Sequence, residues 1–376
     1  MDDLRKRTWA EIDLGNIKHN YLAIRRAMPE GCRFLGVVKA DAYGHGSVQV
    51  SRLLQDAGAD YLAVSCLDEA MELRQNGIYL PILILGHTPE EFTGTLINND
   101  LTQAVTCLAK AEEYSREASR LGKMLRVHMK IDTGMSRLGF LCSGEHFDEG
   151  VENVVASCRM PGLHAEGIFT HFSVSDEPGE DNEAYTRAQY ELFRRLIDAV
   201  EERGVSFEIR HCANSGAVVN YPEMMLDMVR PGLLLYGYGD TKGTLGLKPC
   251  MSLVTRISTI KHYESGTCVS YGRRYTTERR TRMAVLGIGY ADGLPRLASN
   301  KCSFAIGSLF APQRGSICMD MCMADVTDIP EAAVDSEVEI FGQKNPIEGL
   351  CEAAQTVPYE LLCAVSKRVP RIYRAI

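Results

Sequence analysis

Short apolar runs alternate with amphipathic segments along the first two thirds of the chain. The runs predict strands at 34–38, 61–65, 81–85, 102–106, 126–131, 165–170, 208–213 and near 228–235. Segments with helical spacing lie between most of them, among them 48–57, 67–75, 109–121 and 184–203. Strands alternating with helices indicate βαβ units and a parallel sheet. Eight units within about 200–250 residues are typical of a TIM barrel, although a doubly wound sheet gives the same alternation.

The pattern changes after residue 240. Apolar and polar positions alternate over 247–270, and further short strands are predicted at 282–288, 303–309, 318–326 and 337–341. No long helical segment follows until about residue 352, which is typical of a mostly β domain. We therefore expect a barrel over residues 1–240 and a β domain over 241–376. The first predicted strand, near residues 8–14, is a candidate partner for the β domain.

Composition and charge exclude several classes of protein. The 376 residues are 45% hydrophobic and 24% charged, as in ordinary globular proteins with a sizeable core. A net charge of −8 argues against a nucleic-acid partner. Neither a signal peptide nor an apolar run long enough to span a membrane is visible, so we expect a cytoplasmic protein. The thirteen cysteines are scattered, which indicates reduced thiols and no metal site.

A lysine closes the first strand of the repeating pattern, in the segment Phe34-Leu-Gly-Val-Val-Lys39. Gly44 and Gly46 follow and end the extended run. An ammonium group at the end of a buried strand is costly to desolvate, which would lower its pKa towards that of a nucleophilic, Schiff-base-forming amine. The same side chain could instead reach out to water, so its position alone leaves both interpretations open.

Further candidate site residues follow this strand and several later ones. They are Tyr43 after the first strand, Lys130, Asp132 and Arg137 after the fifth, His171 after the sixth, Asn214 and Ser215 after the seventh, and Arg230 and Gly232 at the eighth. Each alone would be an ordinary core or surface residue. Barrel active sites form at the carboxyl ends of the strands, so their recurrence at this end predicts one site.

The segment Val37-Val-Lys39-Ala-Asp-Ala-Tyr43-Gly-His-Gly46 resembles the pyridoxal-phosphate (PLP) lysine motif of the alanine racemase family. The similarity extends over nearly the whole chain, through Cys268-Val-Ser-Tyr271-Gly and Gly315-Ser-Ile-Cys-Met319-Asp320 to the segment that begins at Arg368. It implies a PLP-dependent isomerase of fold type III, an α/β protein with an N-terminal (β/α)8 barrel and a C-terminal β domain. It further implies a homodimer whose β domains complete the partner's active sites and which makes D-alanine for peptidoglycan.

The resemblance also implies roles for individual residues. Lys39 and Tyr271 match the two catalytic bases, with Tyr271 supplied by the partner subunit, while Arg137 and Met319 match substrate-binding residues. The matching cofactor-binding residues are Lys39, Tyr43, His171, Asn214, Ser215, Arg230, Gly232, Leu233 and Tyr359. Supporting positions are Asp320, Tyr290 and Lys130, the last matching a lysine that is carbamylated in some relatives.

Arg230 is informative about the reaction. Most PLP enzymes place a carboxylate against the pyridine nitrogen, whereas an arginine cannot accept that proton. An unprotonated ring is a weaker electron sink, which suppresses transamination. This suits an enzyme that only removes and returns one proton.

Three alternatives remain open. A serine racemase of the same build is the nearest, and Tyr359 argues against it because serine-specific relatives tend to carry a small polar residue there. A non-catalytic PLP-binding homeostasis protein would resemble the barrel alone, which leaves residues 241–376 unexplained. A decarboxylase of this fold type is expected to face the pyridine nitrogen with a carboxylate where this chain has Arg230.

Overall fold

A computed structural model describes residues 5–374 of the chain. The chain forms two compact units, which are described separately. The first, here the barrel unit, comprises residues 17–42 and 47–248. The rest of the described chain, residues 5–16, 43–46 and 249–374, forms the β unit.

The strands of the barrel unit pair in parallel and in chain order. Those of the barrel itself are β2 (Arg33–Val37), β3 (Tyr61–Val64), β4 (Ile82–Ile84), β5 (Leu101–Val105), β6 (Leu125–Asp132), β8 (Leu163–Phe169), β9 (Ile209–His211) and β10 (Met228–Val229). The two-residue strand β7 (Phe140–Leu141) pairs with the end of β6 outside this order. β10 pairs back onto β2, and the amide of Arg230 donates to the carbonyl of Ala213 across the remaining gap at 2.9 Å. The barrel is thus nearly closed, which confirms the predicted fold class and excludes a doubly wound sheet.

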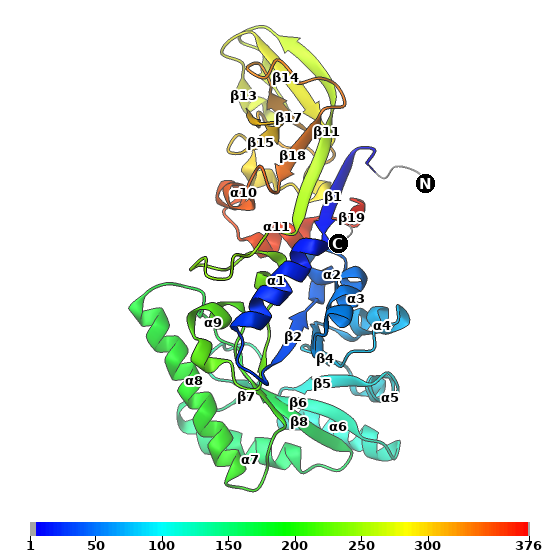
Figure 1. Ribbon diagram of the computed structural model, residues 1–376, viewed down its shortest axis with the longest axis vertical. Helices are drawn as coiled ribbons and strands as arrows, with labels where there is room; N and C mark the ends of the chain where they lie inside the picture. Colours follow the sequence, from blue (N-terminus) through cyan, green and yellow to red (C-terminus); the bar gives the residue numbers. More distant parts are fainter. Residues whose placement is uncertain (1–4, 375–376) are drawn as a thin grey trace. The chain divides into compact units, whose positions relative to one another are not determined.

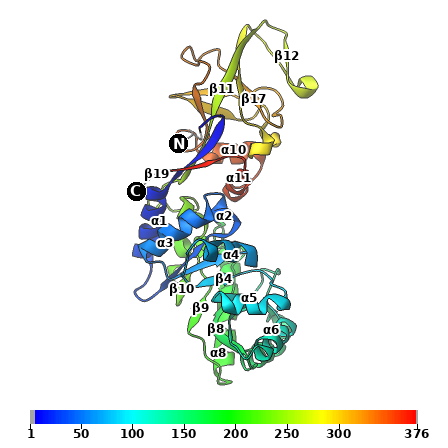
Figure 2. The same cartoon turned by 90° about the vertical axis from the view of Figure 1, so that its right-hand side faces the viewer.

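Helices separate the strands and lie outside them (Figures 1 and 2). The helices are α1 (Leu14–Ala27), α3 (Ser47–Ala57), α4 (Leu67–Gln75), α5 (Thr93–Asn98), α6 (Leu108–Arg120), α7 (Phe147–Cys158), α8 (Glu180–Glu201) and α9 (Ser215–Asn220). In α6 the buried residues are Ala111, Tyr114, Ser115 and Ala118, one stripe at helical spacing. Burial of such a stripe against the strands holds each helix in place.

The β unit contains a mixed sheet in the order β16-β15-β18-β11-β1-β19, with β14 pairing β11 and β17. Its strands are β1 (Thr8–Asp13), β11 (Met251–Tyr263), β14 (Thr281–Leu286), β15 (Ser303–Ile306), β16 (Leu309–Pro312), β17 (Cys322–Asp325), β18 (Glu337–Phe341) and β19 (Arg371–Arg374). β1 pairs antiparallel with β11 and parallel with β19. Helices α10 (Ile347–Ala354) and α11 (Pro358–Ala364) follow β18.

Some predicted strands are shorter than expected. The run near 228–235 is a strand only at Met228–Val229, because Pro231 and Gly232 interrupt it, and Leu233–Tyr236 form a 3-10 turn. The segment expected to start at residue 318 becomes a strand only at Cys322, since Cys318 donates to the carbonyl of Met321 in a tight turn. The alternating run 247–270 divides into β11 and the short β12 (Cys268–Val269), which pairs β13 (Tyr275–Thr276).

All thirteen cysteines are free thiols, as predicted. Across residues 5–374 we find no helix with the length and apolar character needed to cross a membrane.

Candidate active site

The carboxyl ends of five barrel strands carry polar residues. Lys39 follows β2, Lys130 lies near the end of β6, His171 follows β8, Ser215 follows β9 and Arg230 follows β10. In a parallel barrel these ends share one face. The residues predicted from the first, fifth, sixth, seventh and eighth strands therefore gather at one end of the barrel unit.

Lys39 opens a left-handed turn. Ala40, Asp41 and Ala42 have φ of 52°, 54° and 53°, and Tyr43 continues at 52°. Non-glycine residues rarely adopt this conformation, which costs about 1–2 kcal/mol per residue. The amide of Ala40 donates to Glu69 Oε1 at 2.7 Å, and Asp41 Oδ1 accepts from the amide of Ser47 at 2.7 Å. The barrel therefore holds Lys39 at the start of a strained backbone, as is common at functional sites.

Arg230 is buried and its guanidinium is held by the protein. Nη1 donates to His211 Nδ1 at 3.0 Å. Nη2 donates to the carbonyls of Thr170 and Cys212 at 2.7 and 3.0 Å and contacts His171 Nδ1 at 3.3 Å. Burial lowers the pKa of Arg230 to about 10, so it is still a cation at neutral pH. Among the described residues Nε has no hydrogen-bond acceptor, which leaves this N–H available to a ligand.

Lys130 and His171 surround this cation. Lys130 is 7% exposed, and burial together with Arg230 lowers its pKa to about 7. Its Nζ donates to the carbonyl of Ile131 at 3.1 Å. Burial, then Arg230 and Lys130, lower the pKa of His171 well below its usual value. His171 is therefore neutral, and Lys130 is partly uncharged near neutral pH.

The loops after β9 and β10 meet at Ser215. Its Oγ accepts from the amide of Gly232 at 3.0 Å and from that of Leu234 at 3.5 Å, next to Leu233 at the start of the 3-10 turn. Asn214 caps α9 by accepting from the amide of Ala217 at 3.0 Å. Because the Ser215 oxygen accepts these bonds, its own proton can be donated to an anion.

The loop after β6 carries Arg137. Asp132 Oδ1 shapes this loop by accepting from the amides of Gly134 and Ser136, both at 3.0 Å. Arg137 is exposed, yet near enough to contribute to the lowered pKa values of Lys130 and His171.

The remaining predicted residues belong to the β unit. The rings of Tyr43 and Tyr359 lie 5.9 Å apart between centroids. Burial, and to a lesser extent Tyr359, raise the pKa of Tyr43, so its hydroxyl stays protonated. These two predicted cofactor-binding residues are therefore neighbours.

Tyr271, Tyr290 and Met319 lie on connected loops and are 72%, 43% and 53% exposed. Ser316 Oγ donates to the carbonyl of Tyr271 at 2.9 Å, and the amide of Tyr290 donates to that of Cys318 at 2.9 Å. The loops that carry these three predicted residues are distant in sequence but are hydrogen-bonded to one another and exposed.

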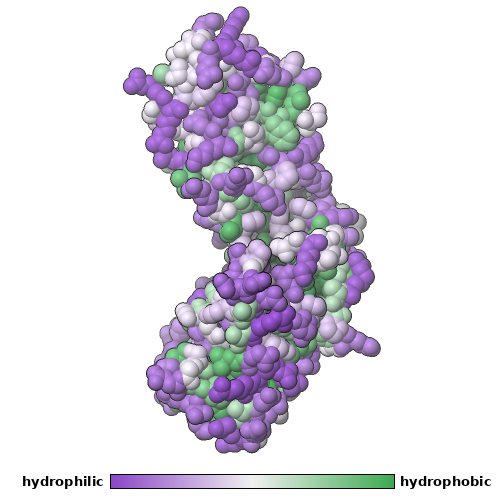
Figure 3. Space-filling view, turned by 90° about the vertical axis from the view of Figure 1, so that its left-hand side faces the viewer, coloured by the Kyte–Doolittle hydropathy of each residue, from purple (hydrophilic) through white to green (hydrophobic). Residues whose placement is uncertain are grey.

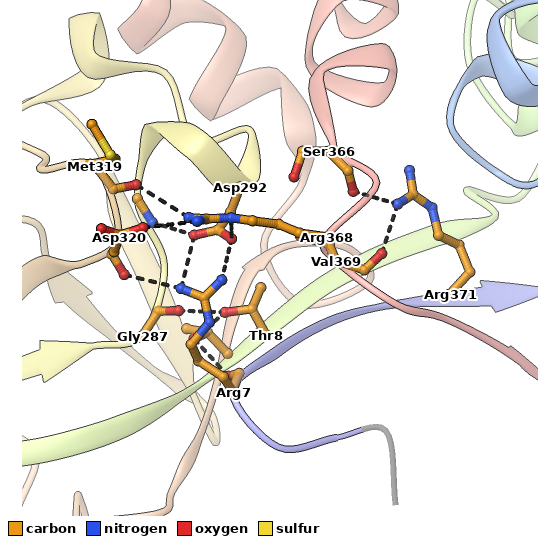
Figure 4. Close-up of polar contacts among 12 residues, drawn as sticks. Arg7, Thr8, Gly287, Asp292, Met319, Asp320, Ser366, Arg368, Val369 and Arg371 are labelled. Atoms are coloured by element: carbon orange, nitrogen blue, oxygen red, sulfur yellow. Dashed lines mark hydrogen bonds and ion pairs between the residues drawn. The ribbon is translucent and has the colours of Figure 1, made fainter.

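A buried carboxylate that the sequence reasoning missed anchors these loops (Figure 4). Asp292 accepts from Arg7, from Arg368 Nε at 2.8 Å and from the amide of Gly289 at 2.9 Å. Arg368 Nη1 also donates to Asp320 Oδ1 at 2.9 Å. Asp292 therefore connects the loop of Tyr290 to the segment of Met319 and Asp320. Its place in Gly289-Tyr-Ala-Asp292-Gly gave no signal of burial.

Sequence reasoning also missed His128, His211 and Glu166. His128 contacts His211 at 2.9 Å and Glu166 at 3.1 Å inside the barrel. A signal was present, because His128, Lys130 and Asp132 alternate along β6 and therefore share one face. No described group of three or more His, Cys, Asp or Glu side chains is placed to hold a metal ion.

Two family models match the chain, the alanine racemase N-terminal domain over residues 12–240 and the alanine racemase C-terminal domain over residues 250–373. The chain belongs to the alanine racemase family. An alanine racemase of Clostridium perfringens (strain SM101 / Type A) is 42% identical, and the alignment covers 100% of this chain and 97% of that protein. As a member of this family the chain is an isomerase, and its homologues support alanine racemisation.

Solved structures of family members agree with the fold. Alanine racemase of Clostridium difficile 630 matches with a TM-score of 0.92 at 39% identity, covering 98% of this chain and 96% of that chain. Its complex with cycloserine matches with a TM-score of 0.88 at 38% identity, covering 98% and 95%. Both units of the racemase fold are therefore present.

Proposed function

We propose that this chain interconverts L- and D-alanine with PLP as cofactor, and that it supplies D-alanine for peptidoglycan in the cytoplasm. The observation that carries the proposal is Arg230. The barrel buries a cationic guanidinium, fixes both Nη atoms and leaves Nε–H for a ligand. Such a group suits a cofactor nitrogen that must stay unprotonated.

The barrel residues fit PLP. Lys39 would bind its carbonyl carbon, Arg230 would face its ring nitrogen, and His171 would lie beside it. We also assign a role in binding PLP to Tyr43 and Tyr359, which are neighbours in the β unit. Its phosphate suits the Ser215 hydroxyl with Asn214 and the amides of Gly232 and Leu233, since barrel phosphate sites commonly use the loops after strands seven and eight. When bound, PLP supplies an electron sink that makes the α-proton of the amino acid removable.

Racemisation needs a proton donor or acceptor on each face of the α-carbon. We assign Lys39 to one face and Tyr271 to the other. Arg137 and the amide of Met319 would bind the substrate carboxylate, with Asp320 and Tyr290 as supporting residues. The uncharged amine of Lys130 is the form able to take up CO2, so carbamylation of this residue is part of the proposal.

A homodimer would bring Tyr271 to the site of the partner. The face drawn in Figure 3 is mostly hydrophilic, with hydrophobic residues gathered in separate small areas. The exposed large apolar side chains of the β unit are Tyr271, Tyr290, Leu297, Leu309, Phe310, Met319, Met321, Val334 and Val357. Three of these, Tyr271, Tyr290 and Met319, lie on loops that are hydrogen-bonded to one another, and apolar side chains exposed together in this way suit a surface that another chain covers.

The test is chiral chromatography of products from purified, PLP-supplemented protein given L-alanine or L-serine in separate reactions. We expect D-alanine to form much faster than D-serine, since Tyr359 offers the serine hydroxyl a less suitable site than a small polar residue would. The margin can be modest, because pockets reject an added hydroxyl weakly.

The matched control is Lys39→Ala, which we expect to lose both the visible absorption band of the bound cofactor and nearly all turnover. Faster D-serine formation would contradict the assignment of Tyr359. If the wild-type protein formed neither product while binding PLP, racemisation of alanine and of serine would both be excluded.

A further inference from the structure

A continuous line of hydrogen bonds leads from Arg230 through the interior of the barrel. Arg230 Nη1 contacts His211 Nδ1 at 3.0 Å, and His211 Nε2 contacts His128 Nδ1 at 2.9 Å. His128 Nε2 then contacts Glu166 Oε2 at 3.1 Å. Four side chains, one directly after β10 and the others from β9, β6 and β8, are thereby joined end to end.

The chemistry of the two ends gives this line one direction. A guanidinium can only donate hydrogen bonds, so His211 Nδ1 must be the unprotonated nitrogen. A neutral His211 therefore carries its proton on Nε2 and donates to His128 Nδ1. His128 in turn carries its proton on Nε2 and donates to Glu166, which as a carboxylate can only accept. Each ring has one tautomer that satisfies both neighbours.

The protonation states required for this are those that the barrel favours. Burial lowers the pKa of His128 despite the opposing effect of Glu166, and burial with Arg230 lowers that of His211 well below its usual value. Burial would raise the pKa of Glu166, but hydrogen bonds from His128 and Tyr61 lower it to about 2. Both rings are therefore neutral, and Glu166 is ionised.

Close packing restricts rotation of the two rings. His211 stacks on Phe169 with centroids 4.8 Å apart and planes at 11°. Gly167 lies under His128, and a Cβ at this position would come within 2.7 Å of the ring. Tyr61 donates to Glu166 Oε2 at 2.6 Å, which fixes the carboxylate.

We infer that Glu166 is a positioning residue for catalysis, acting through His128 and His211 to fix the orientation of Arg230 and keep its Nε–H directed at the cofactor. The catalytic part of this inference rests on the proposed function. The direction of the hydrogen bonds does not, because it follows from the protein alone.

The direction can be measured in the full-length, PLP-loaded protein with 15N-labelled histidine rings by solid-state NMR. Protonated and unprotonated ring nitrogens give well separated signals. We expect neutral rings with the proton on Nε2 for both His128 and His211, assigned by the signals lost in His128→Gln and His211→Gln. A proton on Nδ1 of either ring, or a doubly protonated ring, would overturn the inference whether or not the protein is a racemase.

The catalytic role is tested with Glu166→Leu and its conservative counterpart Glu166→Gln, whose carbonyl can still accept from His128. In Glu166→Leu we expect a second set of ring signals, a shifted cofactor absorption band and about tenfold lower kcat with a smaller change in KM, comparable to the loss of an outer-shell partner. In Glu166→Gln we expect one set of signals and kcat within about threefold of wild type.

The matched control is Glu208→Leu, which removes a carboxylate 3.4 Å from His164 in an exposed pair on the same unit. We expect wild-type ring signals and kcat for this variant. Wild-type signals and kcat in Glu166→Leu would overturn the inference, as would equal losses in Glu166→Gln and Glu166→Leu. If Glu166→Leu does not fold, the wild-type tautomers and Glu166→Gln still decide the question.

Discussion

Lys130 lies near the end of β6, inside the barrel, and the cations Arg230 and Arg137 are near enough to affect its pKa. Burial and Arg230 lower its pKa from 10.5 to about 7, and Asp132 only partly opposes this. At neutral pH the folded chain therefore holds an amine that is readily deprotonated. The consequence is a dependence of stability on pH, because the unfolded chain restores the ordinary pKa.

We predict that Lys130→Met removes this dependence. Between pH 7 and 10 the unfolded chain binds one proton more at this lysine than the folded chain does, so wild-type stability gains up to about 1.4 kcal/mol per pH unit from it. The advantage of the methionine variant should therefore be largest below pH 7 and shrink as the pH rises. Urea midpoints of both proteins in CO2-free buffers, at intervals from pH 6.5 to 9.5, measure this. Parallel midpoint curves would contradict the lowered pKa of Lys130.

Tyr271 presents most of its side chain to solvent within one chain. We predict that Tyr271→Phe retains bound PLP and loses exchange of the α-proton with deuterated solvent mainly when L-alanine is the substrate. The reason is that Lys39 still serves the other face. Mass spectrometry of alanine recovered from either enantiomer gives both rates. Equal losses would leave the assignment of faces without support, and unchanged rates would remove Tyr271 as a base.

At the scale of elements, the left-handed turn after β2 is the most unusual local structure. Ala40 has φ of 52° and is exposed, so its side chain adds strain without burial. Glycine adopts this conformation without the Cβ penalty, although it also makes the unfolded chain more flexible. In a right-handed helix alanine makes the folded protein more stable than glycine does. At Ala40 we expect this order of stability to reverse.

We predict that Ala40→Gly leaves stability unchanged or raises it by up to about 1 kcal/mol. The matched control is Ala188→Gly, at an exposed position of the right-handed helix α8, which should lose about 1 kcal/mol. Thermal unfolding of the two variants in parallel measures the contrast. A loss at Ala40 equal to that at Ala188 would show that the turn is not left-handed in solution.

The sequence predicted regular elements better than it predicted irregular ones. Apolar runs located every barrel strand, because burial on both faces leaves a strong signal. Ala40-Asp-Ala-Tyr43 gave little indication of a left-handed turn, since Asp41 alone among these residues is enriched in that conformation and tertiary hydrogen bonds hold the turn. The segment 318–321 was predicted as strand from its apolar residues, whereas contacts of Asp320 with Arg7 and Arg368, both far away in sequence, fix it as a loop.

The candidate site was predicted in the same uneven way. Strand-end positions placed Lys39, His171 and Arg230 without reference to any relative, because barrel geometry collects such residues. Tyr271 and Met319 had no local signal and came only from family resemblance. His211, which contacts Arg230, and His128, which contacts His211, could have been found from the histidine in β9 and the alternation of polar residues along β6.

For the whole molecule, the proposed dimer makes each active site depend on two chains. We predict that Lys39→Ala and Tyr271→Phe proteins, each inactive alone, regain activity when unfolded, mixed in equal amounts and refolded together. Half of the dimers would be mixed, and each would hold one site with both Lys39 and Tyr271, which gives about a quarter of wild-type activity. Chiral chromatography of D-alanine measures the recovery. If both bases came from one chain, no mixed dimer would contain an intact site and no activity would return.

The position of β1 has a consequence for biosynthesis. This strand lies between β11 and β19, and its partners in β19 are residues 371–374. On the ribosome, Trp9, Ala10 and Ile12 are synthesised before their pairing partners in β11, which follow about 240 residues later. At 5–20 residues per second this interval takes about 12–50 s. Throughout that time β1 has no sheet to join, while the barrel unit, which lies between β1 and β11 in the sequence, can already fold. β1 is therefore among the last of the described strands to become native, and its apolar side chains are the ones that a ribosome-associated chaperone would have to shield.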